Sequence, residues 1–260
     1  MKKYQIFAGL GLALLIVAYF IPIWWVALQS IQYPKSMYPK GIRIEFKYNG
    51  VYNGCKGQHE RAELANDQAG ADCLVEMNAI NHFIGMYHIT QGRNTEGYRE
   101  YPNYYVFDTE KDAQGNEVKD PETGEAVKID VTPGFLKGLD SLMKNSPYFF
   151  GLFFVLGLFF IFTPKKLNLT FALIPALLPF YFLAAYITGL YWYGHHLGLH
   201  GGGAFGGINE FMPTVFGEGK VAQFVTMSYP YTGFFLTLGT FVFFILAILM
   251  KRKQLKSTAK

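Results

Sequence analysis

Four long apolar runs that contain no Asp, Glu, Lys or Arg constrain this chain of 260 residues more than any other feature. Each run is close to the length of about 17–25 residues with which an α-helix crosses the hydrocarbon of a bilayer. Amphipathic helices of a soluble protein would carry charges along one face. We therefore predict four transmembrane helices, over Ile6–Leu28, Tyr148–Phe162, Leu167–Tyr193 and Phe234–Met250.

The charged residues predict the orientation of these helices. The two chain ends and the turn between the second and third runs hold nine basic and no acidic residues, whereas residues 30–146 hold 13 basic and 17 acidic residues. Basic residues collect on the cytoplasmic side of a membrane. We expect a multi-pass protein of a bacterial inner membrane, with both termini in the cytoplasm and residues 30–146 and 194–228 in the periplasm.

The first apolar run could instead be a cleaved signal peptide, since Lys2 and Lys3 precede it. Its apolar stretch passes 20 residues, however, and it lacks an A-x-A cleavage site. Pro22, Trp24 and Trp25 are typical of a kink and of an aromatic belt at the membrane interface. An uncleaved anchor is the favoured interpretation.

The predicted fold class is a four-transmembrane-helix bundle with a small β-rich periplasmic domain inserted between helices 1 and 2. Residues 1–29 form helix 1, residues 30–146 form the domain, and residues 147–260 form helices 2–4 with a His- and Gly-rich outer loop at 194–228. Alternating polar and apolar residues predict a strand at Ile42–Tyr48. Two further strands, Tyr104–Phe107 and Ala126–Val131, flank a turn-rich segment that should form a protruding hairpin tip.

The chain has two cysteines, Cys55 and Cys73. In an oxidising outer compartment we expect one disulfide, which would close a loop of about 19 residues and stabilise the fold by roughly 3 kcal/mol. The alternative is a pair of thiolates that bind a soft metal, although the spacing matches no known CxxC-type site.

Two clusters contain candidate metal ligands. In a helix, His82 and Met86 would share a face, and His88 lies close by. An imidazole and a thioether together suit Cu(I), although a core histidine and a core methionine would show the same spacing. The second cluster holds His195, His196 and His200, with glycines and Met212 after them. All six histidines of the chain fall on the predicted outer side.

Other classes of function find little support in the sequence. There is no phosphate-binding loop, no recognisable nucleophile–base pair and no CxxCH haem motif, so we do not expect an enzyme. The basic residues are few and adjoin apolar runs, which gives no indication of nucleic-acid binding. The spans also lack the internal charges typical of transporters.

Two motifs resemble a known family. Residues 38–44 (YPKGIRI) with 76–86 (EMNAINHFIGM), and residues 193–200 (YGHHLGLH) with 211–213 (FMP), resemble small membrane proteins encoded beside nitrous-oxide reductase and its copper-delivery and ABC-transporter accessories. The chain departs from the second motif, with Gly198-Leu199 in place of Asp-Pro and Thr214 in place of the second proline. The resemblance implies functional roles for Asn81, His82, Met86, His195 and His200.

The leading hypothesis is therefore a membrane-anchored accessory protein for a periplasmic copper enzyme, which binds Cu(I) or docks a copper carrier at the outer face. Besides the lipid bilayer, its partners would be that enzyme or a copper chaperone, and components of an ABC transporter. The alternatives are a metal-free assembly factor or subunit that binds a protein partner, and a transporter subunit.

Overall fold

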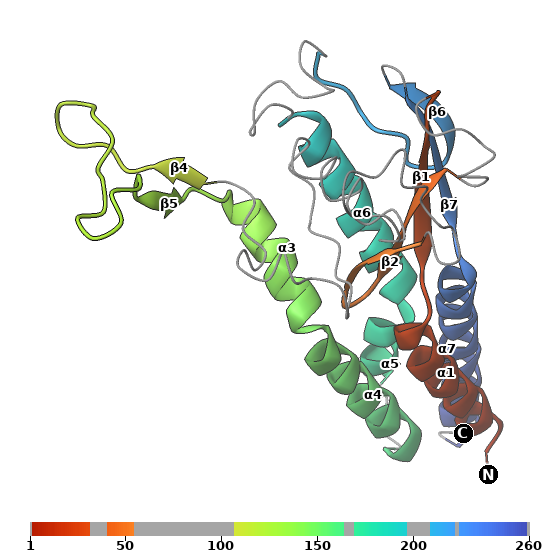
Figure 1. Ribbon diagram of the computed structural model, residues 1–260. Coiled ribbons are helices and arrows are strands. Elements are labelled where there is room, and N and C mark those ends of the chain that lie inside the picture. The colour runs from red at the N-terminus through yellow and green to blue at the C-terminus, as the bar shows by residue number, and fades with distance from the viewer. Residues whose placement is uncertain are drawn as a thin grey trace.

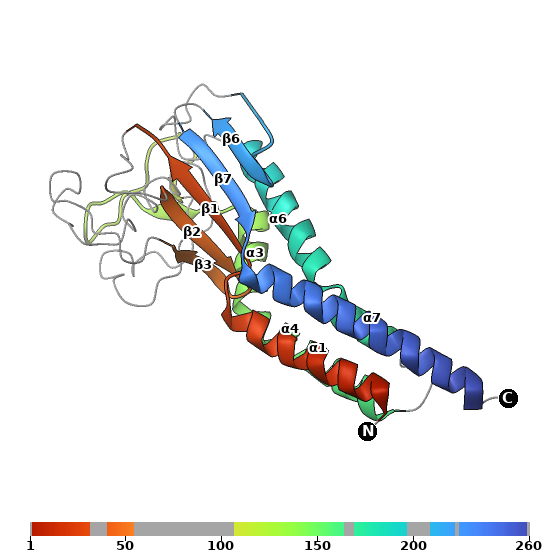
Figure 2. The same cartoon turned by 90° about the vertical axis from the view of Figure 1, so that its right-hand side faces the viewer.

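The computed structural model describes residues 2–31, 41–54, 107–163, 169–196, 209–221 and 224–258. These residues form a bundle of helices with a β-sheet at one end (Figure 1). Both chain termini lie at the opposite end of the bundle from the sheet, as Figures 1 and 2 show.

Two helices are long and apolar enough to cross a membrane, namely Lys3–Phe20 (α1) and the segment Thr232–Ser257 of α7 (Thr232–Thr258). They pack side by side along most of the length of α1 (Figure 2). Small residues allow this approach, since Ala8 of α1 and Ala247 of α7 are completely buried in the shared core. By length and composition, each of these two helices could cross a bilayer.

Two further helix pairs pass the same test of length and composition only if each bent pair counts as one span. Gly134–Lys144 (α3) and Ser146–Phe162 (α4) meet at 54°, and Leu169–Ala176 (α5) and Leu178–Gly194 (α6) meet at 43°. Prolines explain both bends, because proline lacks an N–H and disturbs the preceding turn. Pro147 opens α4, Pro175 lies inside α5 and Pro179 opens α6.

The main sheet joins strands from both predicted outer segments. Its five antiparallel strands have the order β3-β2-β1-β7-β6, with bounds Trp24–Gln29 (β1), Ile42–Lys47 (β2), Gly50–Asn53 (β3), Gly217–Val221 (β6) and Phe224–Pro230 (β7). One face of this sheet packs against α6 through Trp24, Phe46 and Tyr186. The predicted strand at Ile42–Tyr48 is confirmed as β2.

The first predicted span was wrong in its extent. The helix expected over Ile6–Leu28 ends at Phe20, and the apolar residues that follow form β1 at the centre of the sheet. The cause is Pro22, because the residue before a proline avoids helical geometry. Ile21 is accordingly extended, with φ −99° and ψ 141°.

The turn-rich segment after residue 106 forms the predicted hairpin. Phe107–Thr109 (β4) pairs with Lys128–Asp130 (β5), and the hairpin projects away from the helices (Figure 1). Gly115 and Gly124 adopt positive φ angles of 88° and 71° in its two turns, as the turn chemistry predicts. The helix α3, which follows the hairpin, was not expected.

Candidate metal site at the C-terminal end of α6

Two adjacent histidines mark the point where α6 ends, at the end of the molecule that holds the sheet (Figure 1). The helix stops at Gly194, and His195 is its C-terminal cap. The backbone N–H of His195 still donates to the carbonyl oxygens of Tyr191 and Trp192, each over 3.2 Å. The last turn of α6 therefore fixes the backbone from which both imidazoles project.

Each imidazole is held by the residue four positions before it. Nδ1 of His195 lies 2.7 Å from the carbonyl oxygen of Tyr191, and Nδ1 of His196 lies 2.7 Å from that of Trp192. The rings also stack, with centroids 3.9 Å apart for His195 on Tyr191 and 4.3 Å apart for His196 on Trp192. The two rings are consequently held by both a hydrogen bond and an aromatic contact.

This arrangement determines which nitrogen can bind a metal. A carbonyl oxygen only accepts hydrogen bonds, so Nδ1 of each neutral ring carries the proton. Nε2 then keeps its lone pair, and it lies on the side of the ring away from the helix carbonyl. Histidines that bind metals usually hold their other nitrogen in this way, with a hydrogen bond to a carbonyl or carboxylate. The same bonds also satisfy carbonyls at the helix end.

The segment that contains Met212 runs against this helix end. The backbone N–H of Phe211 donates to the carbonyl oxygen of Gly194 over 3.2 Å. A side chain at position 194 would collide with the carbonyl oxygen of Phe211, so this close approach requires glycine. Met212 follows directly, with 44% of its side chain exposed. The structure therefore brings the backbone of Phe211, the residue before Met212, against Gly194, the residue before the histidine pair.

The candidate ligands are two imidazoles and a thioether. Such ligands suit Cu(I) better than Mg²⁺ or Ca²⁺, which prefer oxygen. Among the described residues, no group of three or more His, Cys, Asp and Glu side chains could hold a metal ion. A closed site at this place would need a further ligand beyond His195 and His196, and a thioether could supply it.

The remaining predicted site residues, Asn81, His82, Met86, His88, His200, Cys55 and Cys73, lie outside the described residues. Their proximity to one another and to His195 stays a prediction. Sequence reasoning also overlooked Trp192, whose indole stacks on His196 on one side of the site and on Phe135 of α3, with centroids 4.9 Å apart. Its position four residues before a histidine in a helix is the signal that could have found it.

We compared the chain with protein-family models, with curated proteins and with solved structures, and none of the three comparisons finds a match.

Proposed function

We propose that this chain is a multi-pass accessory protein of the bacterial inner membrane that serves a periplasmic copper enzyme of the nitrous-oxide reductase type. In this proposal the bent pairs α3–α4 and α5–α6 complete four spans. The sheet and the outer end of α6 face the periplasm, where they hold Cu(I) or dock a copper carrier. Components of an ABC transporter are further partners.

The placement of charge supports this orientation. Lys2 and Lys3 at the start of α1 and Arg252 and Lys253 near the end of α7 lie at the end of the bundle away from the sheet (Figure 1). Basic residues at one end of a helical bundle indicate its cytoplasmic side. His195 and His196 then lie on the periplasmic side.

The observation that carries the copper assignment is the fixed pair of imidazoles. Both Nδ1 atoms are bound to helix carbonyls, and both rings are stacked on aromatic neighbours. Metal sites gain affinity when the ligands are oriented before the ion arrives. A solvated loop histidine would have no such constraint.

One structural feature supports the second candidate, a metal-free assembly factor. The β4–β5 hairpin projects away from the rest of the protein (Figure 1), and most of residues 108–125 are exposed. Two tight turns stabilise its tip through Asp112 and Asp120, which accept hydrogen bonds from the backbone N–H groups of Asn116 and Glu122 over 2.8 Å each. A stable projecting arm of this kind suits contact with a protein partner.

A complementation experiment separates the two candidates. In a host that makes this chain beside a periplasmic copper enzyme, deletion of the gene should lower the copper content of the purified enzyme. A gene for the His195→Asn/His196→Asn variant should fail to restore the copper content if the chain handles Cu(I). Full restoration by this variant would contradict the copper role and favour the assembly factor.

The topology is tested with reporters that are active only in the periplasm. A fusion within Gln114–Asn116 should be active, and a fusion after Lys260 should be silent. An active terminal fusion would contradict the four-span orientation.

A further inference from the structure

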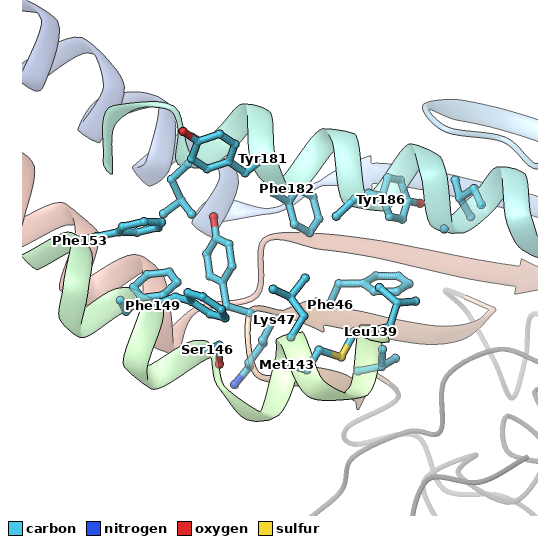
Figure 3. A pocket seen from close by; sticks show the side chains of 18 of the residues that line it. Phe46, Lys47, Leu139, Met143, Ser146, Phe149, Phe153, Tyr181, Phe182 and Tyr186 are labelled. Atoms are coloured by element: carbon cyan, nitrogen blue, oxygen red, sulfur yellow. The ribbon is translucent and has the colours of Figure 1, made fainter. Parts of the chain in front are cut away.

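An apolar cavity of about 320 Å³ lies between the bent pair α3–α4 and the helix α6. The end of β2, with Phe46 and Lys47 (Figure 3), and Tyr48 in the turn that follows form its third wall. The volume falls at the lower end of the range of about 300–1,000 Å³ typical of small-molecule sites. It does not belong to the candidate metal site, since neither His195 nor His196 lines it.

The cavity follows most of the length of α6. Aromatic side chains of α4 and α6, among them Phe153 and Tyr181, lie at the end toward the bundle (Figure 3). At the other end α3 meets α6, where Phe135 stacks on Trp192 and Leu136 packs against Tyr193. Lining residues of α6 run from Leu178 to Tyr193, which corresponds to about 22 Å of helix at 1.5 Å per residue.

Two polar side chains lie where the wall of the cavity passes from α3 to α4. Lys47 and Ser146 both line the cavity and lie near each other where α3 gives way to α4 (Figure 3). Here the hydroxyl of Tyr19, near the end of α1, lies 3.4 Å from Oγ of Ser146. The helix α1 ends one residue later, at Phe20.

The helix α3 has the character of a helix at a membrane surface. Leu139 and Met143 point an apolar side toward the cavity, whereas Lys137 and Lys144 carry ion pairs with Asp130 and Asp140 on the exposed side. Amphipathic character of this kind is typical of helix segments at a membrane surface, here the part of the bent pair α3–α4 nearest the sheet. The ammonium of Lys47 lies beside the cavity, 4.7 Å from the ring centroid of Tyr52.

Size and charge together select the occupant. If one methylene needs about the 30 Å³ that one water occupies in the liquid, the cavity holds roughly ten methylene groups, which is the larger part of one acyl chain. The length of α6 along the cavity exceeds the roughly 15 Å thickness of one leaflet of hydrocarbon. A lysine beside the cavity favours an anionic lipid.

We propose that this cavity binds one acyl chain of an anionic phospholipid from the bilayer, with the phosphate of the head group beside Lys47. The bound chain fills the space between α3 and α6 and leaves Phe135 in contact with Trp192. Because Trp192 also stacks on His196, the lipid supports the outer end of α6 from below.

The test uses the full chain in detergent, with phosphatidylglycerol and phosphatidylcholine of matched chains added in equal amounts and counted by native mass spectrometry. The Gly189→Leu variant fills the cavity, and the nearest atom to a new Cβ there is 3.9 Å away, in Tyr193. Gly151→Leu on the exposed side of α4 is the matched control, since nothing lies within 4 Å of its new Cβ.

We expect the wild type and Gly151→Leu to retain one phosphatidylglycerol, and Gly189→Leu to lose at least nine-tenths of it. Lys47→Gln should keep a lipid but lose about fivefold of its preference for phosphatidylglycerol, as expected for one lysine near a membrane surface. Lys144→Gln, outside the cavity, should keep the preference. Equal retention by Gly189→Leu and Gly151→Leu would overturn the proposal, as would a wild type that retains no lipid.

Discussion

The indole N–H of Trp24 donates a hydrogen bond to the hydroxyl of Ser228 over 2.8 Å, across 204 positions of sequence. The hydroxyl of Tyr186 lies 2.8 Å from the same oxygen, and Ser228 itself donates to the carbonyl oxygen of Val215 over 2.7 Å. One buried serine therefore connects β1, β7, α6 and the segment that leads from Met212 into β6. Through this serine the sheet fixes the position of α6, and hence of the histidine pair at its end.

Replacing this serine tests the importance of the connection. Ser228→Ala leaves the buried Trp24 N–H without its acceptor and removes a partner from Tyr186 and Val215. An unsatisfied buried polar group costs about 1–3 kcal/mol, so the free energy of unfolding should fall by about 2–4 kcal/mol. Chemical denaturation in detergent measures the change. Ser257→Ala, at an exposed position near the end of α7, is the control and should stay within about 0.5 kcal/mol of wild type.

A buried lysine closes the other end of the bundle. Lys251 of α7 is 2% exposed, and its Nζ donates to the carbonyl oxygens of Phe160 and, over 2.6 Å, of Thr163 at the end of α4. The hydroxyl of Tyr4 donates to the neighbouring carbonyl of Ile161 over 3.4 Å. Helices end with unsatisfied carbonyls, and here side chains of α1 and α7 satisfy them.

We therefore expect Lys251→Met to lower the free energy of unfolding by about 2–4 kcal/mol, because two carbonyls lose their donor at once. Lys253→Met changes an exposed lysine of the same helix and should have little effect. If Lys251→Met and Lys253→Met both unfold like the wild type, Lys251 contributes only a positive charge that orients the chain in the membrane. It then does not stabilise the carbonyls at the end of α4.

Gly194, at the end of α6, and Gly189, five residues earlier in the same helix, offer a matched pair of substitutions. An added Cβ at Gly194 would meet the carbonyl oxygen of Phe211 and, at 2.8 Å, Cδ of Pro213, whereas one at Gly189 has its nearest atom at 3.9 Å. Gly194→Ala should destabilise the fold by about 1–3 kcal/mol, as overpacking does. Gly189→Ala should be neutral or stabilising by about 0.5–1 kcal/mol, because alanine favours a helix. If the thermal melts of Gly194→Ala and Gly189→Ala coincide, that result would contradict the close approach of residues 211–213 to Gly194.

The sequence predicted the elements whose signals are local. The strand β2 follows from alternating residues, and the β4–β5 hairpin follows from its turn glycines and aspartates. The strand β1 could not be separated from α1 by hydropathy, because Trp24–Gln29 contains no charge either, and the decisive residue was Pro22. The sequence of α3 does indicate a helix, since Leu136, Leu139 and Met143 recur with helical spacing. This helix was not predicted because the segment is short and charged, unlike the four apolar runs.

The candidate site was predictable in its residue types and not in its geometry. Histidine, methionine and glycine residues indicated the outer end of α6. The contact between Gly194 and Phe211 depends on the β6–β7 hairpin joining the sheet beside β1, which is a long-range pairing that no local pattern encodes. The aromatic support from Tyr191 and Trp192 likewise emerges only once α6 is known to run to Gly194.

The central claim is that the histidine pair at the end of α6 binds Cu(I), and retention of Cu(I) by the purified protein tests it most directly. The chain is loaded with Cu(I) in detergent and challenged with a competing chelator. Three proteins are compared: the wild type, Met212→Leu and His195→Asn/His196→Asn. Asparagine keeps an N–H donor for the helix carbonyls but removes Nε2, so the helix end stays capped while the ligand is lost. We predict that the wild type retains about one Cu(I), that Met212→Leu retains less, and that the asparagine variant retains none under the same challenge. Equal retention by the wild type and the asparagine variant, with unchanged thermal melts, would contradict the account.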